Sequence, residues 1–207
     1  MKLMFFSDIH GVPSTLKKLF EHAFSLKPDR LILLGDALYH GPRNGVPDFY
    51  DPVEVARLLN EKAEMITAVR GNCDADVDQM LLLFPLMARY SVLLVGEHKF
   101  FLTHGHIWHP ANLPPLGSSD VLAFGHTHVP VLYKAEDGTV IFNPGSVTLP
   151  KSGFPPTFGM LHDDGTLAVY RMDGDWPENP TFEDLQNRQL QNGFILKTRL
   201  LKSFIHC

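Results

Sequence analysis

Seven side chains of types that bind metal ions lie in five short, glycine-rich segments of the sequence. The segments are Ser-Asp-Ile-His-Gly, Leu-Gly-Asp-Ala, Arg-Gly-Asn-Cys-Asp, Thr-His-Gly-His and Phe-Gly-His-Thr-His. The seven candidate ligands within them are Asp8, His10, Asp36, Asn72, His104, His126 and His128. All seven offer oxygen or imidazole donors, which suit hard and borderline divalent ions. Because almost every segment follows an apolar run, the pattern is typical of a two-metal hydrolytic site at the ends of sheet strands.

The charges of these donors indicate what such a site could do. Two metal ions close together need a bridging carboxylate, and Asp36, the only donor in its segment, is the natural candidate. Two divalent ions carry more positive charge than Asp8 and Asp36 can offset, so the remaining field would attract a phosphate and lower the pKa of a bridging water. The resulting hydroxide could attack phosphorus in line.

The first 70 residues predict the elements that position three of the donors. Apolar runs at residues 3–7, 31–34 and 65–69 indicate buried strands. Apolar spacing at residues 14–24, with Ser14 as N-cap, and an Asp-Pro-Val-Glu start at Asp51 indicate two helices. Alternating strands and helices predict a parallel sheet. Asp8, Asp36 and Asn72 would then meet at one edge, where the strands end.

The second half reads as mostly β structure. Strands are expected at residues 92–95, 99–103, 121–124, 129–134, 140–143, 158–162 and 167–171, with hairpin turns at 136–138 and 163–165. Two sheets packed face to face, with helices outside, would house both halves. The Gly- and Pro-rich loop at residues 38–50 directly follows Asp36, and a loop this long inside a domain is more often functional than not. Residues 1–174 are expected to form one domain, and residues 175–207 an extension of uncertain structure.

Composition limits the classes of function. The chain has 207 residues, a formal net charge of -5 and a pI near 6.1, so nothing favours long nucleic acids or anionic membranes as partners. Cys73 and Cys207 are the only cysteines and give no disulfide framework. No apolar stretch approaches the roughly 20 residues needed to span a bilayer. We therefore expect a cytoplasmic protein. The apolar residues at 194–196 and 200–201 leave a homo-oligomer open as an alternative.

Taken in order, the segments closely resemble the calcineurin-like metallophosphoesterase superfamily, and most of all its small bacterial phosphodiesterases of the YfcE type. The superfamily carries Asp-x-His, Gly-Asp, Gly-Asn, His and Gly-His-x-His in this order. His-Gly-Pro-Arg-Asn at residues 40–44 and Asn-Pro-Gly-Ser at 143–146 are also similar to that subgroup. The resemblance covers about residues 1–172 and implies a four-layer α/β/β/α sandwich of two mixed sheets with flanking helices.

The resemblance also implies how the metals are held. One ion would be bound by Asp8, His10, Asp36 and His128, and the other by Asp36, Asn72, His104 and His126. Two divalent ions are therefore expected, with Mn²⁺ as the first choice and Zn²⁺, Fe²⁺ or Ni²⁺ as alternatives. Asp36 and Asn72 would serve catalysis through these ions, and Asn72 would also meet the substrate.

Several neighbouring residues are candidates for further roles. Many phosphatases of this superfamily have a His directly after Gly-Asn, whereas this chain has Cys73, and a neutral thiol is a poor general acid. His106 could take over that role or simply line a turn. Arg43 could bind a phosphate, although loop arginines are usually solvated. Asp74 is a candidate for orienting a metal ligand.

Other candidates belong to packing or surface roles. Trp108 and Phe49 could stack on an aromatic leaving group, although aromatic residues near pockets usually serve packing. Histidines without a surrounding motif, among them His98 and His162, are expected at the surface.

The leading hypothesis is a dinuclear metal-dependent phosphodiesterase that uses a metal-bridging hydroxide. Cys73 favours diesters with good leaving groups. The alternatives are a non-catalytic scaffold on the same fold, which the complete set of donors disfavours, and a phosphomonoesterase.

Overall fold

Two mixed β-sheets form the centre of the protein, in a computed structural model that describes residues 1–174 and 197–199. The first sheet has the order β11-β10-β9-β1-β2-β3, and the second has the order β4-β5-β6-β8-β7. The strands of the first sheet are β1 (Leu3–Phe6), β2 (Arg30–Leu33), β3 (Ile66–Ala68), β9 (Thr157–Leu161), β10 (Thr166–Arg171) and β11 (Lys197–Arg199). Those of the second are β4 (Tyr90–Val95), β5 (His98–Thr103), β6 (Val121–Ala123), β7 (Val131–Lys134) and β8 (Val140–Asn143).

The central strands of the first sheet are buried on both faces, and their alternate side chains serve two different cores. On β1, Met4 and Phe6 face the helices, whereas Leu3 and Phe5 face the second sheet. Side chains of a strand alternate between its faces, so a continuous apolar run is needed where both faces are covered. This explains the continuous apolar runs of the sequence, which locate the central strands.

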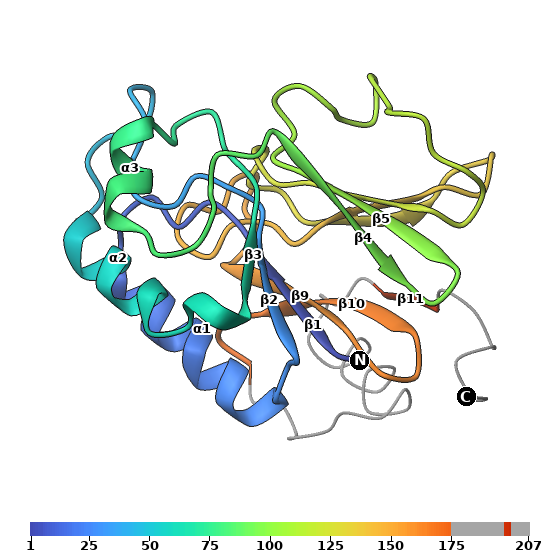
Figure 1. Cartoon of the computed structure of the whole chain (residues 1–207), viewed down its shortest axis with the longest axis horizontal. Coiled ribbons are helices and arrows are strands. Elements are labelled where there is room, and N and C mark those ends of the chain that lie inside the picture. The colour runs from blue at the N-terminus through green and yellow to red at the C-terminus, as the bar shows by residue number, and fades with distance from the viewer. Residues whose placement is uncertain (175–196, 200–207) are drawn as a thin grey trace.

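Three α-helices lie in the described part of the chain: α1 (Pro13–Leu26), α2 (Pro52–Asn60) and α3 (Asp76–Leu81). The helices α1 and α2 cover the face of the first sheet that points away from the second sheet (Figure 1). The α2 N-cap is Asp51, as predicted, and its side chain accepts the Glu54 N–H. The prediction of Ser14 as the α1 N-cap is wrong, because Val12 is the N-cap and Pro13 begins the helix.

The outer face of the second sheet is covered differently. Its apolar cluster contains Phe101, Leu122 and Ile141, and Trp108 and Leu116 from the segment after β5 pack against it. Within residues 1–174 this covering segment is a loop rather than an α-helix. The predicted fold class, an α/β sandwich of two mixed sheets with flanking helices, is confirmed, and a loop forms its fourth layer in the described region.

The predicted strands are confirmed, with ends shifted by no more than a few residues. Strands β1, β2 and β3 pair in parallel, and the two predicted turns join the antiparallel pairs β7–β8 and β9–β10. Sequence did not indicate that β9 returns to pair with β1. Of the predicted extension at 175–207, only residues 197–199 are described, and they pair with β10. The rest lies outside the described residues, so the domain boundary stays a prediction. None of the described helices has the length and apolar character needed to span a membrane.

Candidate metal centre

The seven candidate ligands come from loops that follow five strands. Asp8 and His10 follow β1, Asp36 follows β2, and Asn72 follows β3. His104 follows β5, and His126 and His128 follow β6. The site therefore lies across the carboxyl ends of strands from both sheets, where ligands of α/β folds collect.

The donor atoms of these loops converge. His128 Nε2 lies 3.2 Å from Asp8 Oδ1, and His104 Nε2 lies 3.3 Å from Asp36 Oδ2. His10 Nε2 is 3.6 Å from Asp8 Oδ1 and 3.8 Å from Asp36 Oδ2, so this imidazole lies between the two carboxylates. Asn72 Oδ1 lies 3.1 Å from His104 Nε2 at the exposed rim. Two groups of donors, Asp8-His10-His128 and Asp8-Asp36-His104, could each hold a metal ion. Within each group, the donor atoms all lie within 4.8 Å of one another.

Three of the imidazoles are oriented by backbone carbonyls. The Nδ1 atoms of His10, His104 and His128 lie 2.8, 2.7 and 2.6 Å from the carbonyl oxygens of Tyr39, Leu34 and Leu149. A carbonyl only accepts hydrogen bonds, so each Nδ1 must carry the proton. In the neutral imidazole, Nε2 then presents its lone pair to the centre, which is the usual arrangement of a metal-binding histidine.

Asp8 provides the test of whether a cation fits. Its Oδ1 is buried and accepts no hydrogen bond from the described residues. A buried carboxylate oxygen without a donor is costly, and a cation would satisfy it. The lone pairs of His10 and His128 face the same point, where their Nε2 atoms are 3.3 Å apart. This donor set therefore fits a divalent metal ion.

The charges of the buried aspartates also favour positive charge at the site. Burial acts to raise the pKa of Asp8, but the neighbouring imidazoles of His10 and His128 outweigh it and hold that pKa far below its usual range. Burial acts to lower the pKa of His104, yet the hydrogen bond to Asp36 and the charge of Asp8 raise it to about 9. Hydrogen bonds and positive charge beside the carboxylates thus favour their ionised form, and a divalent ion would supply such charge.

The backbone at the site is strained. Asp8, His10, Asp36, His126 and His128 all have positive φ, between 50° and 66°. Non-glycine residues rarely adopt this left-handed region, and each such residue costs about 1 kcal/mol or more. Five of the seven candidate ligands share this conformation, which aims their side chains at one point, and such strain gathers at functional sites.

Asp74 supports the loop that carries Asp36. Its buried carboxylate accepts three backbone N–H bonds, from Asp36 at 2.8 Å, Ala37 at 2.8 Å and Gly71 at 2.7 Å. Burial and the nearby charge of Asp36 raise the pKa of Asp74 to about 6, although these N–H donors act in the opposite direction. This geometry is what the predicted role of orienting a ligand requires.

Two further side chains, Ser146 and Asn143, position the loops that carry candidate ligands, although the sequence did not single them out as functional. The Ser146 hydroxyl donates to the backbone oxygen of Asp8, and the Asn143 amide donates to the backbone oxygen of Gly125. Both side chains are fully buried. The Asn-Pro-Gly-Ser segment, whose similarity to the subgroup was visible in the sequence, therefore fixes the loops after β1 and β6.

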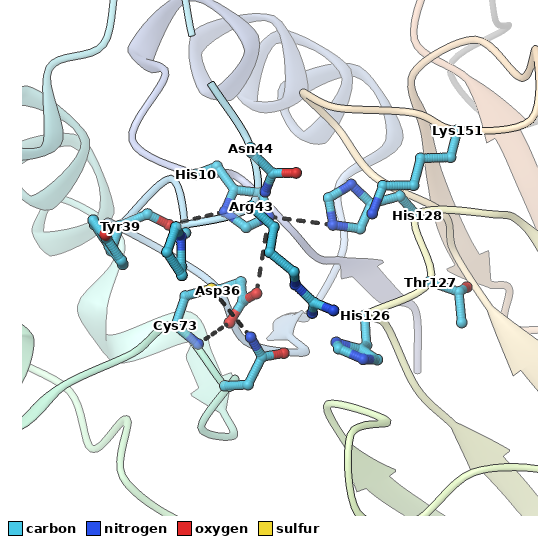
Figure 2. Close-up of a pocket in the computed structure, with 13 residues that line it drawn as sticks. His10, Asp36, Tyr39, Arg43, Asn44, Cys73, His126, Thr127, His128 and Lys151 are labelled. Carbon is cyan, nitrogen blue, oxygen red and sulfur yellow. Dashed lines mark hydrogen bonds and ion pairs between the residues drawn. The ribbon is translucent and has the colours of Figure 1, made fainter. Parts of the chain in front are cut away.

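A cavity of about 630 Å³ opens over the candidate ligands and is lined by His10, Asp36, Asn72, His126 and His128 together with residues of the 38–50 loop. Figure 2 shows the Arg43 side chain extending into this space toward His126, and the Lys151 side chain lying beside His128. Neither cation has an ion-pair partner in the part of the chain that the structure describes. Sequence reasoning missed Lys151, which belongs to none of the recognised segments.

The two candidates for proton transfer lie in different places. Cys73 lines the cavity, and its backbone N–H donates to Asp36 Oδ1 at 2.8 Å. Burial and the charge of Asp36 raise the pKa of the Cys73 thiol to about 12, so it stays neutral. The exposed His106 ring is centred 5.5 Å from the ring of His104, but it lines a neighbouring groove rather than this cavity. Phe49 and Trp108 line neither space.

Comparison with known proteins places the chain in a family. Residues 1–165 match the calcineurin-like phosphoesterase superfamily domain. Phosphodiesterase YfcE of Escherichia coli K12 is 50% identical over 165 residues, which cover 79% of this chain and 89% of that protein. The solved structure of the E. coli phosphoesterase YfcE superposes with a TM-score of 0.81 at 47% identity, covering 84% of this chain and 94% of that one.

A more distant structure shares the fold alone. Vacuolar protein sorting 29 from Cryptosporidium parvum superposes with a TM-score of 0.54 at 20% identity and covers 82% of this chain and 89% of that one.

The chain belongs to the calcineurin-like phosphoesterase superfamily. The predicted resemblance to this superfamily and to its YfcE-type members is confirmed. It is accordingly an enzyme, a metal-dependent phosphoesterase, and the family implies divalent metal ions as cofactors.

Proposed function

We infer that this protein hydrolyses small phosphodiesters with the help of two divalent metal ions. One observation carries the inference: lone pairs of oriented imidazoles and oxygens of two buried carboxylates converge beside an open cavity. The same cavity is lined by Arg43 and Lys151, which form no ion pair with another described residue. The name of the 50%-identical relative, a phosphodiesterase, supports the prediction of a phosphoric diester hydrolase.

The ligand sets that we propose follow the predicted ones. Asp8, His10 and His128 surround one position, with Asp36 shared, and Asn72, His104 and His126 surround the other. The His126 ring is centred 5.1 Å from the ring of His104. When bound, divalent ions would supply a water of lowered pKa as the attacking hydroxide and positive charge that offsets the charge on the phosphoryl oxygens. Mn²⁺ is our first choice, and Zn²⁺, Fe²⁺ and Ni²⁺ stay alternatives.

The chain's own groups then bind and orient the substrate. Arg43 can donate two parallel hydrogen bonds to phosphoryl oxygens, and Lys151 offers a second positive charge on the His128 side. Asn72, at the exposed rim, can contact both an ion and the substrate. His106 stays our candidate for the group nearest the leaving oxygen, because the Cys73 thiol holds its proton too tightly.

Metal reconstitution tests this function. Protein stripped of metal should bind about two equivalents of Mn²⁺ in equilibrium dialysis and should then hydrolyse bis(p-nitrophenyl) phosphate faster than p-nitrophenyl phosphate. Asp36→Asn should lower both stoichiometry and turnover, whereas Asp29→Asn, which changes an exposed carboxylate, should change neither.

Two outcomes would change the proposal. Metal binding without turnover of any ester would favour the scaffold, and faster monoester turnover would favour a phosphomonoesterase. The donors are present at all seven positions, which argues against the scaffold. A cytoplasmic location, an absence of long nucleic acid as substrate, and a homo-oligomer stay predictions.

A further inference from the structure

A second groove, of about 550 Å³, adjoins the metal-binding cavity and differs from it in character. Its lining residues include Val129, Val131 and Tyr133 together with His109, Pro110 and Phe124. The two spaces share His126 and Thr127 as lining residues. A group attached to a phosphate at the metal centre therefore needs to pass only these two residues to enter the groove.

The groove has the lining chemistry of a site for an uncharged, largely apolar group. Val129, Val131 and Tyr133 are spaced two apart at and along the edge strand β7, so their side chains point to one face. Phe124 contributes a buried ring to the groove, and Tyr133 is 47% exposed. Among the described residues that line the groove there is no carboxylate, lysine or arginine, whereas the main cavity contains Arg43 and Lys151. The site is thus divided into a cationic side and an apolar side.

We propose that this groove, called here the apolar groove, binds a planar aromatic substituent of the substrate while the phosphate lies at the metal centre. Its volume falls in the range of about 300–1,000 Å³ that is usual for small-molecule sites. Tyr133 offers a ring face for stacking, and His106, whose ring is centred 5.5 Å from the ring of His104, offers an imidazole edge. The proposal rests on the proposed function and specifies its substrate class: diesters with at least one aromatic ester group. Tyr133, rather than Trp108 or Phe49, is the aromatic residue that recognises it.

Two phosphonates that differ only in their substituent provide the test. Calorimetry on the Mn²⁺-saturated protein should give an affinity for phenylphosphonate about tenfold higher than for methylphosphonate, because only the phenyl ring fills the groove. Tyr133→Ala should remove most of this preference and leave methylphosphonate binding unchanged. Tyr133→Phe keeps the ring and should keep the preference.

The matched control is Tyr90→Ala. Tyr90 is also an exposed tyrosine on an edge strand of the same sheet, but it stacks on Phe101 and lines no part of the apolar groove. This variant should keep the preference for phenylphosphonate.

The outcomes separate the two proposals. Equal affinities for the two phosphonates, or a preference for phenylphosphonate that survives Tyr133→Ala, would overturn the proposal that the apolar groove binds an aromatic substituent. The proposed function would still hold if the protein hydrolysed bis(p-nitrophenyl) phosphate. If neither phosphonate bound and no diester were hydrolysed, the proposed function would fail, and the groove assignment with it.

Discussion

Replacing Asp74 by Asn should weaken the metal centre although it replaces none of the candidate ligands. The Asp74 carboxylate accepts one N–H through Oδ1, from Ala37, and two through Oδ2, from Asp36 and Gly71. The side-chain amide of Asn has a single oxygen, so at least one of the three bonds is lost and the new NH₂ group meets a backbone donor. The backbone of Asp36 then loses part of what fixes its position.

The size of the effect follows from that count. A hydrogen bond to a charged group contributes about 1.5–3 kcal/mol, so losing one or two should lower the free energy of unfolding by about 2–5 kcal/mol. Changes in groups that orient metal ligands typically weaken metal affinity about 10–100-fold, and we expect that range for Mn²⁺ here. Urea unfolding of the metal-free protein measures the first quantity, and calorimetric titration with Mn²⁺ measures the second.

Asp78→Asn is the matched control. Asp78 is also a buried carboxylate, but it accepts one N–H, from Ala75, at the start of α3. Its replacement should cost some stability and leave Mn²⁺ affinity unchanged. A folded Asp74→Asn protein that bound Mn²⁺ within about twofold of the original would refute the orienting role, since that role predicts at least about a tenfold loss.

Three further predictions concern other residues. A Cβ atom at Gly71 would overlap Oδ1 and the backbone N of Asp36 and would lie 2.8 Å from the Cγ of Asp36. Gly71→Ala should therefore lower kcat/KM about 100-fold. Gly45→Ala should leave kcat/KM unchanged, because a Cβ atom at Gly45 would have no other atom within 4 Å. Lys151→Met should raise the KM for a diester about three- to tenfold and reduce its salt dependence, while Lys18→Met on α1 leaves both unchanged in the same kinetic assay. Burial lowers the pKa of His162, so the folded state binds fewer protons than the unfolded state and stability should fall as pH drops through about 6.5. His162→Gln should make the decrease in unfolding free energy between pH 7.5 and 5.5 smaller, and an unchanged decrease would assign it to other groups.

The fold was predictable wherever both faces of a strand are buried. Residues 31–34 could be read as a strand because neighbouring residues serve different cores, with Leu31 and Leu33 facing the helices and Ile32 facing the second sheet. The same reasoning fails at a surface. Phe24 matches the apolar spacing of α1, yet its side chain is 83% exposed. Apolar spacing identifies a helix but does not say how much of its face the neighbouring elements cover.

Buried polar residues show a second limit of sequence reasoning. His98 and His162 were predicted at the surface, and both predictions are wrong because the two side chains are buried. His98 Nδ1 bonds to the Ser119 carbonyl, and His162 Nε2 bonds to the Tyr170 hydroxyl. A histidine can be buried when it has such a partner, and a partner supplied by tertiary packing is invisible in the sequence. Lys151 escaped notice for the same reason, since only the fold brings it beside His128.

The types and order of the candidate ligands were predictable from the sequence, but the backbone conformation that orients their side chains was not. Asp and His adopt positive φ more often than most non-glycine residues, but they do so in only a small fraction of cases, so the sequence does not show that Asp36 or His128 takes this conformation. The Asp36 carbonyl accepts the N–H groups of Ile9 and His10, and Asp8 Oδ2 accepts the N–H of His126. The loops after β1, β2 and β6 therefore hold one another in strained positions through bonds that involve both sheets. These bonds join groups of the protein itself, so part of the cost of the strained geometry is offset within the fold. We therefore expect changes such as Asp74→Asn, which replace no donor atom but remove bonds that position the Asp36 loop, to weaken metal binding.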